Sequence, residues 1–149
     1  MTDRQLREYC EAEFENIDAV LAELELVILP EKTSYTTAEL AAAATFIHNC
    51  YNGVENVLKR ICAYVSMEIK ASPTWHKDLI KASLDRGIID ENLYNSLSIY
   101  LSFRHFFVHS YSFSLRWEEL EPLVVGLEEV VGKFKAVIKR YLDILRTEV

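Results

Sequence analysis

The chain has 149 residues, of which 50% are hydrophobic and 26% are charged, a composition typical of a globular protein. This length predicts one domain, residues 1–149, large enough for a hydrophobic core. The formal net charge of -7 argues against a protein that binds nucleic acid over its whole surface, but it leaves room for a small basic cleft. Charged residues interrupt every apolar run before it reaches the roughly 20 residues that a membrane span requires.

Residues 1–8 contain no apolar signal core, and we therefore expect a cytoplasmic protein without a membrane-bound segment. The three cysteines, Cys10, Cys50 and Cys62, are widely spaced and form no Cys-x-x-Cys pair. This pattern predicts buried free thiols rather than a metal or redox site.

Helical periodicity begins at the N-terminus and predicts a first helix over residues 3–29, which a proline ends. Thr36 and Glu39 have the spacing of a capping box at the start of a second helix. That helix continues without proline to about residue 69. Its one glycine, Gly53, is where we expect a kink.

The second half of the chain predicts three more helices. Pro73 suits the first turn of a short helix over residues 75–86, and Gly87 closes it. Asp90 caps the fourth helix, and the fifth covers residues 117–146. Apolar and polar residues do not alternate convincingly with a period of two, so no strand is expected. The prediction is an all-α domain, an antiparallel bundle of about five helices.

The fourth predicted helix carries the most unusual stretch, residues 101–111, which reads Leu-Ser-Phe-Arg-His-Phe-Phe-Val-His-Ser-Tyr. At about 100° per residue, Arg104 falls near the centre of an apolar arc about 120° wide. An unpaired guanidinium there would be costly, so Arg104 needs a partner, a bound anion or a solvated cleft between subunits. The arc comprises Leu93, Leu97, Tyr100, Leu101, Phe107 and Val108.

His109 projects about 140° around the same helix from Arg104. The two side chains therefore meet on one substrate only if the helix ends between them, or if a second copy of the chain supplies a second pair. Ile99, Phe103 and Phe106 form a second apolar flank of this helix. Two apolar flanks predict a subunit interface in addition to the core, and so a homodimer.

Arginine and histidine together can cleave RNA without a metal. The 2′-hydroxyl of the ribose is the nucleophile, so the protein has to position it, move protons and stabilise charge. Arg104 would bind the phosphate and His109 would transfer a proton. The spacing alone favours a simpler interpretation, in which Arg104 pairs with a nearby glutamate and His109 lies at a solvated helix end. His105 and His109, four residues apart, have the spacing of two metal ligands on one helix face. No third ligand is evident, so no metal site is predicted.

Three further side chains have simpler interpretations. His48 has apolar neighbours and is expected to be structural. His76 is expected to cap a helix or lie on the surface. Tyr111 lies where the periodicity breaks, and its hydroxyl is either accessible or part of an aromatic anchor for the loop.

Residues 104–109 resemble the Arg-x4-His signature of the HEPN superfamily, in which the residue after the arginine, here His105, is typically polar. With Tyr111 the pattern becomes Arg-x4-His-x-Tyr, which is similar to the HepT-type toxins of HEPN/MNT toxin–antitoxin pairs. The segments 51–61 and 75–79 resemble the second and third helices of that family.

This resemblance implies a homodimeric helical ribonuclease, the toxin of a type VII-like toxin–antitoxin pair, which needs no metal or cofactor and leaves a 2′,3′-cyclic phosphate. It implies that Arg104 stabilises the scissile phosphate, that His109 transfers a proton and that His105 assists. Tyr111 would receive AMP from an MNT-type nucleotidyltransferase antitoxin, with which the dimer could form a larger complex. The alternative is a non-catalytic helical module that binds a nucleotidyltransferase or its nucleotide.

Overall fold

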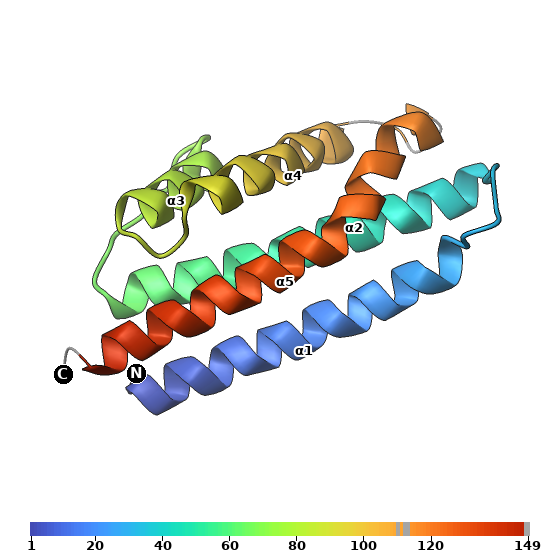
Figure 1. The fold of residues 1–149 in the computed structure, drawn as a ribbon. Coiled ribbons are helices and arrows are strands. Elements are labelled where there is room, and N and C mark those ends of the chain that lie inside the picture. Colours follow the sequence, from blue (N-terminus) through green and yellow to red (C-terminus); the bar gives the residue numbers. More distant parts are fainter. Residues whose placement is uncertain (110, 112–113, 148–149) are drawn as a thin grey trace.

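The computed structural model describes residues 1–109, 111 and 114–147, and these residues form five helices and no strand. The expected all-helical class is therefore confirmed. Figure 1 shows long helices side by side, with the shorter α3 and α4 over one side of them. The helices are α1 (Asp3–Val27), α2 (Thr37–Tyr64), α3 (Trp75–Asp85), α4 (Glu91–His109) and α5 (Trp117–Thr147). Ser110, Ser112 and Phe113, on which part of the predicted break in periodicity depends, lie outside the described residues.

The helix starts largely follow the predicted caps. The Thr36 hydroxyl accepts a hydrogen bond from the Glu39 backbone, and the Glu39 side chain accepts one from the Thr36 backbone, which confirms the capping box. The Asp90 carboxylate accepts a hydrogen bond from the backbone N–H of Leu93 at 2.8 Å. Thr74 precedes α3 without a side-chain capping bond, and its hydroxyl donates to Asp78 instead.

The end of α2 lies five residues before the predicted one, because Ser66 adopts a positive φ of 60°. The N–H of Met67 donates to the carbonyl of Cys62, and the N–H of Ser66 donates to that of Ala63. This is the Schellman arrangement, in which glycine usually occupies the position with positive φ. Since the residue here is serine, the sequence carried no glycine signal for this helix end.

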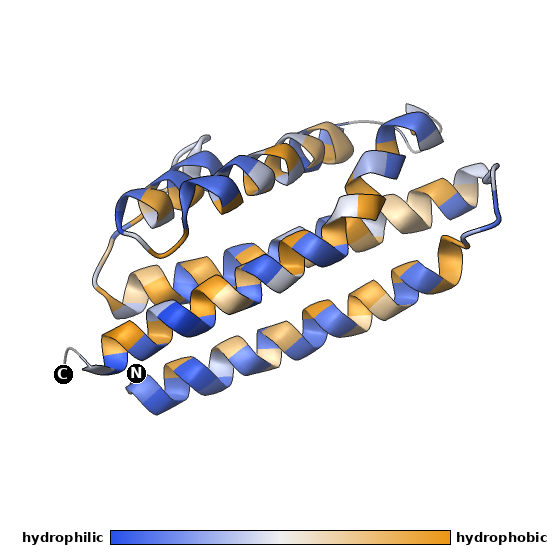
Figure 2. Cartoon of the chain, viewed as in Figure 1, coloured by the Kyte–Doolittle hydropathy of each residue, from blue (hydrophilic) through white to orange (hydrophobic). Residues whose placement is uncertain are grey.

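The core is built around α2, which packs against α1, α3, α4 and α5. Buried apolar side chains come from all five helices, and Figure 2 shows orange and blue residues alternating along each helix, as expected of helices with one buried face. Cys10, Cys50 and Cys62 are buried and free, as predicted, and burial raises the pKa of the Cys10 and Cys50 thiols to about 12. Within the described residues, no helix carries an apolar stretch of the length that a bilayer requires.

Gly53 serves close helix packing, which the sequence did not predict. A Cβ atom at this position would lie 2.6 Å from Cγ1 of Ile17, a buried side chain of α1. We expect Gly53→Ala to destabilise the protein by about 1–3 kcal/mol, because overpacking outweighs the gain of up to about 1 kcal/mol in helix propensity. Urea unfolding followed by circular dichroism measures this change.

Gly132 provides the matched control for that prediction. It lies inside α5, and a Cβ atom there meets no atom within 4 Å. Gly132→Ala is expected to raise the free energy of unfolding by up to about 1 kcal/mol. Equal effects of the two substitutions would contradict the packing role of Gly53.

Two positions of α4 differ from the expected pattern of apolar flanks. Phe103 is buried in the core, whereas it was expected on the second flank with Ile99 and Phe106. Val108 is 48% exposed, whereas it was expected on the core-facing arc. Ile99 and Phe106 are exposed, at 59% and 39%, so an apolar outer flank remains on α4.

Candidate functional site

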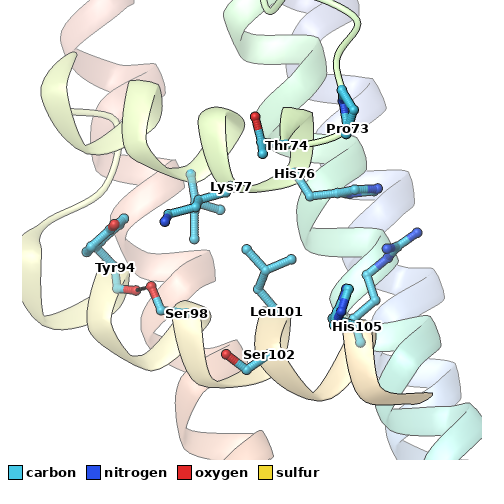
Figure 3. Close-up of a pocket in the computed structure, with 11 residues that line it drawn as sticks. Pro73, Thr74, His76, Lys77, Tyr94, Ser98, Leu101, Ser102 and His105 are labelled. Atoms are coloured by element: carbon cyan, nitrogen blue, oxygen red, sulfur yellow. Dashed lines mark hydrogen bonds between the residues drawn. The ribbon is translucent and has the colours of Figure 1, made fainter. Parts of the chain in front are cut away.

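Arg104 is one of the residues that line a cleft between α3 and α4. Figure 3 shows this cleft with its lining residues as sticks. Its side chain is half-buried, and its Nε atom is buried without a hydrogen-bond partner among the described residues. Arg104 forms no salt bridge with a described carboxylate, so the expected alternative of an Arg–Glu pair finds no support there. The guanidinium therefore retains donors for a bound anion.

The cleft has a volume of about 480 Å³ and a basic, hydroxyl-rich lining. None of the described lining residues is an aspartate or a glutamate. Lys77, Arg104 and several hydroxyl donors line the cleft, and such a lining attracts anions such as phosphates even on a protein whose net charge is -7. The lining comprises Pro73, Thr74, His76, Lys77, Ile80, Tyr94, Ser98, Leu101, Ser102, Arg104 and His105.

Figure 3 shows how the lining is distributed between the two helices. His76 and His105 lie toward one end of the cleft, where α3 and α4 face each other. Tyr94 lies toward the other end, and Lys77 projects between them from α3. The Ser98 hydroxyl donates to the backbone carbonyl of Tyr94 at 2.8 Å, and this hydrogen bond holds the Ser98 side chain on the wall of the cleft.

A buried carboxylate of α2 holds one of these cleft residues. Glu55 is 3% exposed, and its two oxygens lie 2.8 and 2.9 Å from Nδ1 of His76. The Tyr51 hydroxyl, one turn before Glu55, is buried. Burial, followed by the negative charge of Glu55, raises the pKa of Tyr51. The positive charge of Arg104 acts in the opposite direction, so these groups are close enough to influence one another.

His48 lies on the same helix as Glu55, seven residues earlier. Its ring stacks on Phe107 of α4, with ring centroids 5.3 Å apart, and its Nε2 lies 3.2 Å from the Asn52 side-chain amide. Burial lowers the pKa of His48, and the positive charge of Arg104 lowers it further. A neutral, stacked imidazole is consistent with a packing role at this position.

His105 shares the cleft with Arg104, but His109 is not among its lining residues. The rings of His105 and His109 are 4.7 Å apart and meet edge to face. Helix α4 continues through His109, so the helix does not end between Arg104 and His109. One of the two conditions under which Arg104 and His109 could meet is thereby excluded, and the second copy of the chain remains.

Tyr111 follows α4 by two residues, and 74% of its surface is exposed. Its backbone carbonyl accepts a hydrogen bond from the N–H of Ser114 at 2.9 Å. In the described part of the chain, no three His, Cys, Asp or Glu side chains are grouped as metal ligands would be.

The Glu55–His76 pair was not predicted from the sequence, in which His76 was expected at a helix cap or on the surface. One signal was present. Glu55 lies four residues after Tyr51 and one after Val54, within the apolar pattern of α2, and a carboxylate in such a position requires a partner. The identity of that partner was not readable, because His76 lies 21 residues away on another helix.

The described residues form a helical protein whose α4 carries the Arg-x4-His motif. A family model described as "HepT-like protein" matches residues 42–145, which include α3, α4 and most of α2 and α5. The chain therefore belongs to the HepT-like family of the HEPN superfamily, and the expected resemblance is confirmed. Helix α1 lies outside the matched residues. No curated protein and no solved structure matched the chain.

Proposed function

We propose that this protein is a metal-independent endoribonuclease, the toxin of a type VII-like toxin–antitoxin pair. The observation that carries the proposal is Arg104, whose buried Nε lacks a partner among the described residues at a cleft lined by cations and hydroxyls. An RNA phosphate supplies the negative charge that such a guanidinium binds. Membership of the HepT-like family supports a toxin of HEPN type.

In the proposed reaction, the 2′-hydroxyl of a ribose attacks the adjacent phosphate. The products are a 2′,3′-cyclic phosphate and a 5′-hydroxyl, and the reaction requires no metal and no cofactor. Arg104 stabilises the charge that develops on the phosphate oxygens. His109 transfers a proton, and His105, beside it on α4, assists by positioning the phosphate or His109.

A second copy of the chain completes the site in this proposal. His109 lies on the outer side of α4, on the flank that also carries the exposed Ile99 and Phe106. Packing of this flank against the same flank of a second copy buries the exposed apolar side chains. The dimer is also proposed to bring the Arg104/His109 pairs of the two subunits together in one cleft, because one unbroken helix keeps Arg104 and His109 of a single chain apart.

Tyr111 is the proposed point of control. Its exposed ring, just past the end of α4, is within reach of an MNT-type nucleotidyltransferase antitoxin that transfers AMP to the hydroxyl. A bulky anionic group beside His109 repels an RNA backbone and occupies its path. The antitoxin thus inactivates the toxin by modification, within a complex that contains the toxin dimer.

We expect the protein to gain one or more adenylyl groups when it is expressed with the antitoxin, and the Tyr111→Phe variant to gain none. Intact mass spectrometry of the two proteins, each expressed with and without the antitoxin, measures this. Tyr94→Phe, which alters a cleft tyrosine, is the matched control and is expected to be modified like the wild type. Modification of Tyr111→Phe would contradict the assignment of the tyrosine.

The alternative function is a non-catalytic module that binds the nucleotidyltransferase or its nucleotide. The size and basic lining of the cleft favour it as the second candidate, because about 480 Å³ is within the range of small-ligand sites. The two candidates differ in one assay. The proposed ribonuclease cleaves RNA in the presence of EDTA and leaves cyclic phosphate ends, whereas the binding module leaves RNA intact and binds a nucleotide at the cleft.

A further inference from the structure

We infer that His76, held by Glu55, is a second proton-transfer residue of this cleft and acts as the general base that deprotonates the attacking 2′-hydroxyl. The inference rests on the proposed ribonuclease function and adds a residue outside the Arg-x4-His motif. Its role differs from that of His109, which in this scheme protonates the leaving oxygen.

The contact with Glu55 determines which nitrogen of His76 is available. An ionised carboxylate only accepts hydrogen bonds, so Nδ1 of His76 carries the proton and donates it to Glu55. In the neutral ring the other nitrogen, Nε2, then has a free lone pair. No described residue hydrogen-bonds to Nε2, and His76 lines the cleft together with Arg104.

The position of Glu55 indicates that the pair does more than fill space. A carboxylate that is 3% exposed in the interior is costly, and an apolar side chain of similar volume would pack α2 against α3 at least as well. Fixing the tautomer and orientation of a histidine is a function that only a hydrogen-bonding group can perform. Glu55 is accordingly the positioning residue and His76 the residue that faces the substrate.

The charged groups around His76 are suited to an anionic substrate. Glu55 of α2 faces one edge of the ring, while Lys77 of α3 and Arg104 and His105 of α4 line the same cleft. The neighbouring Trp75 ring lies against the imidazole, with centroids 3.5 Å apart, and the Lys59 ammonium lies over that indole. A phosphate bound by Lys77 and Arg104 would lie in the same cleft as the imidazole of His76.

The proposed step is balanced in atoms and charge. The 2′-hydroxyl proton moves to Nε2 of His76 as the O2′–P bond forms. The P–O5′ bond breaks, and the leaving oxygen takes a proton from His109. One proton is accepted and one is donated, and exchange with water restores both histidines. No oxidant, metal or co-reactant takes part.

The test uses the full-length protein and an oligoribonucleotide that the wild type cleaves in EDTA. His76→Ala is expected to lower the cleavage rate about 10²–10⁴-fold, the range for loss of a general base. Added imidazole is expected to restore activity to His76→Ala in proportion to its concentration, and not to Arg104→Ala. A purely structural role of His76 would give no such selective rescue, and that result would overturn the inference.

Two further measurements test whether His76→Ala is slow only because it misfolds, and whether His76 acts as an acid instead of a base. His76→Gln keeps a donor for Glu55 but has no basic nitrogen, so it is expected to fold like the wild type and to be as slow as His76→Ala. Full activity of His76→Gln would overturn the inference even if His76→Ala fails to fold. A substrate whose leaving oxygen is replaced by sulfur needs no acid. The defect of His76→Ala is expected to persist on it, and its disappearance would show that His76 is not the base.

The same experiments separate this inference from the proposed function. If the wild type cleaves the RNA and Arg104→Ala does not, but His76→Ala is fully active, the ribonuclease assignment stands and the role of His76 is wrong. If the wild type does not cleave RNA at all, the proposed function and this inference both fail.

Discussion

Arg104→Ala is expected to lower RNA cleavage about 10²–10³-fold, the effect of removing one group that stabilises charge in a transition state. The guanidinium is the cation at the cleft with a buried donor that has no partner among the described residues, so its removal takes away the principal contact for the phosphate. Cleavage of RNA in EDTA, with gel separation of the products, measures the rate. The same substitution is expected to relieve growth inhibition in cells that express the protein alone.

The matched control for this prediction is Arg140→Ala. Arg140 is an exposed arginine of α5, away from the cleft residues, and its removal changes the net charge by the same amount. We expect Arg140→Ala to cleave RNA at the wild-type rate. Thermal unfolding of both variants shows whether either substitution acts through stability. Activity of a folded Arg104→Ala variant close to that of the wild type would contradict the proposed ribonuclease mechanism.

A mixture of Arg104→Ala and His109→Ala subunits is expected to recover activity that neither variant has alone. In a heterodimer of the two, one subunit supplies Arg104 and the other supplies His109. If the two variants are mixed in equal amounts and associate at random, half of the dimers are heterodimers with one active site of two, so the mixture regains about a quarter of the wild-type rate. The measurement is RNA cleavage after the two purified variants are mixed and allowed to exchange subunits.

The control mixture combines Arg104→Ala with the double variant Arg104→Ala/His109→Ala. It contains no subunit with Arg104, and it is expected to remain inactive. If the first mixture also remains inactive although subunit exchange is demonstrated, the site is completed within one chain, and the proposed pairing across two copies of α4 is wrong.

Much of the fold was readable from the sequence because helix period and caps are local. The capping box at Thr36 and the cap at Asp90 needed only neighbouring residues. The errors arose where local patterns are ambiguous. Ser66 takes a backbone conformation usually reserved for glycine, and the period of α4 did not decide which flank would bury Phe103.

The candidate site was only partly predictable for the same reason. The motif that carries Arg104 and His105 is contiguous, and its position on a helix followed from the period. The cleft itself needs α3 to pack beside α4, and Glu55 reaches His76 only in the folded chain. A pair of residues 21 positions apart leaves no periodic signal, so the structure was required to find it.

If two copies of α4 form the proposed site, the unbroken path of the helix through His109 makes the activity depend on the abundance of the protein. If a lone chain holds half of the machinery, the active species at low abundance rises with the square of the number of chains in the cell. At a low number of chains very little of the active dimer forms, whereas a modest rise in synthesis increases its amount steeply. Such a dependence gives a cell that carries this gene tolerance to leaky expression before any antitoxin intervenes.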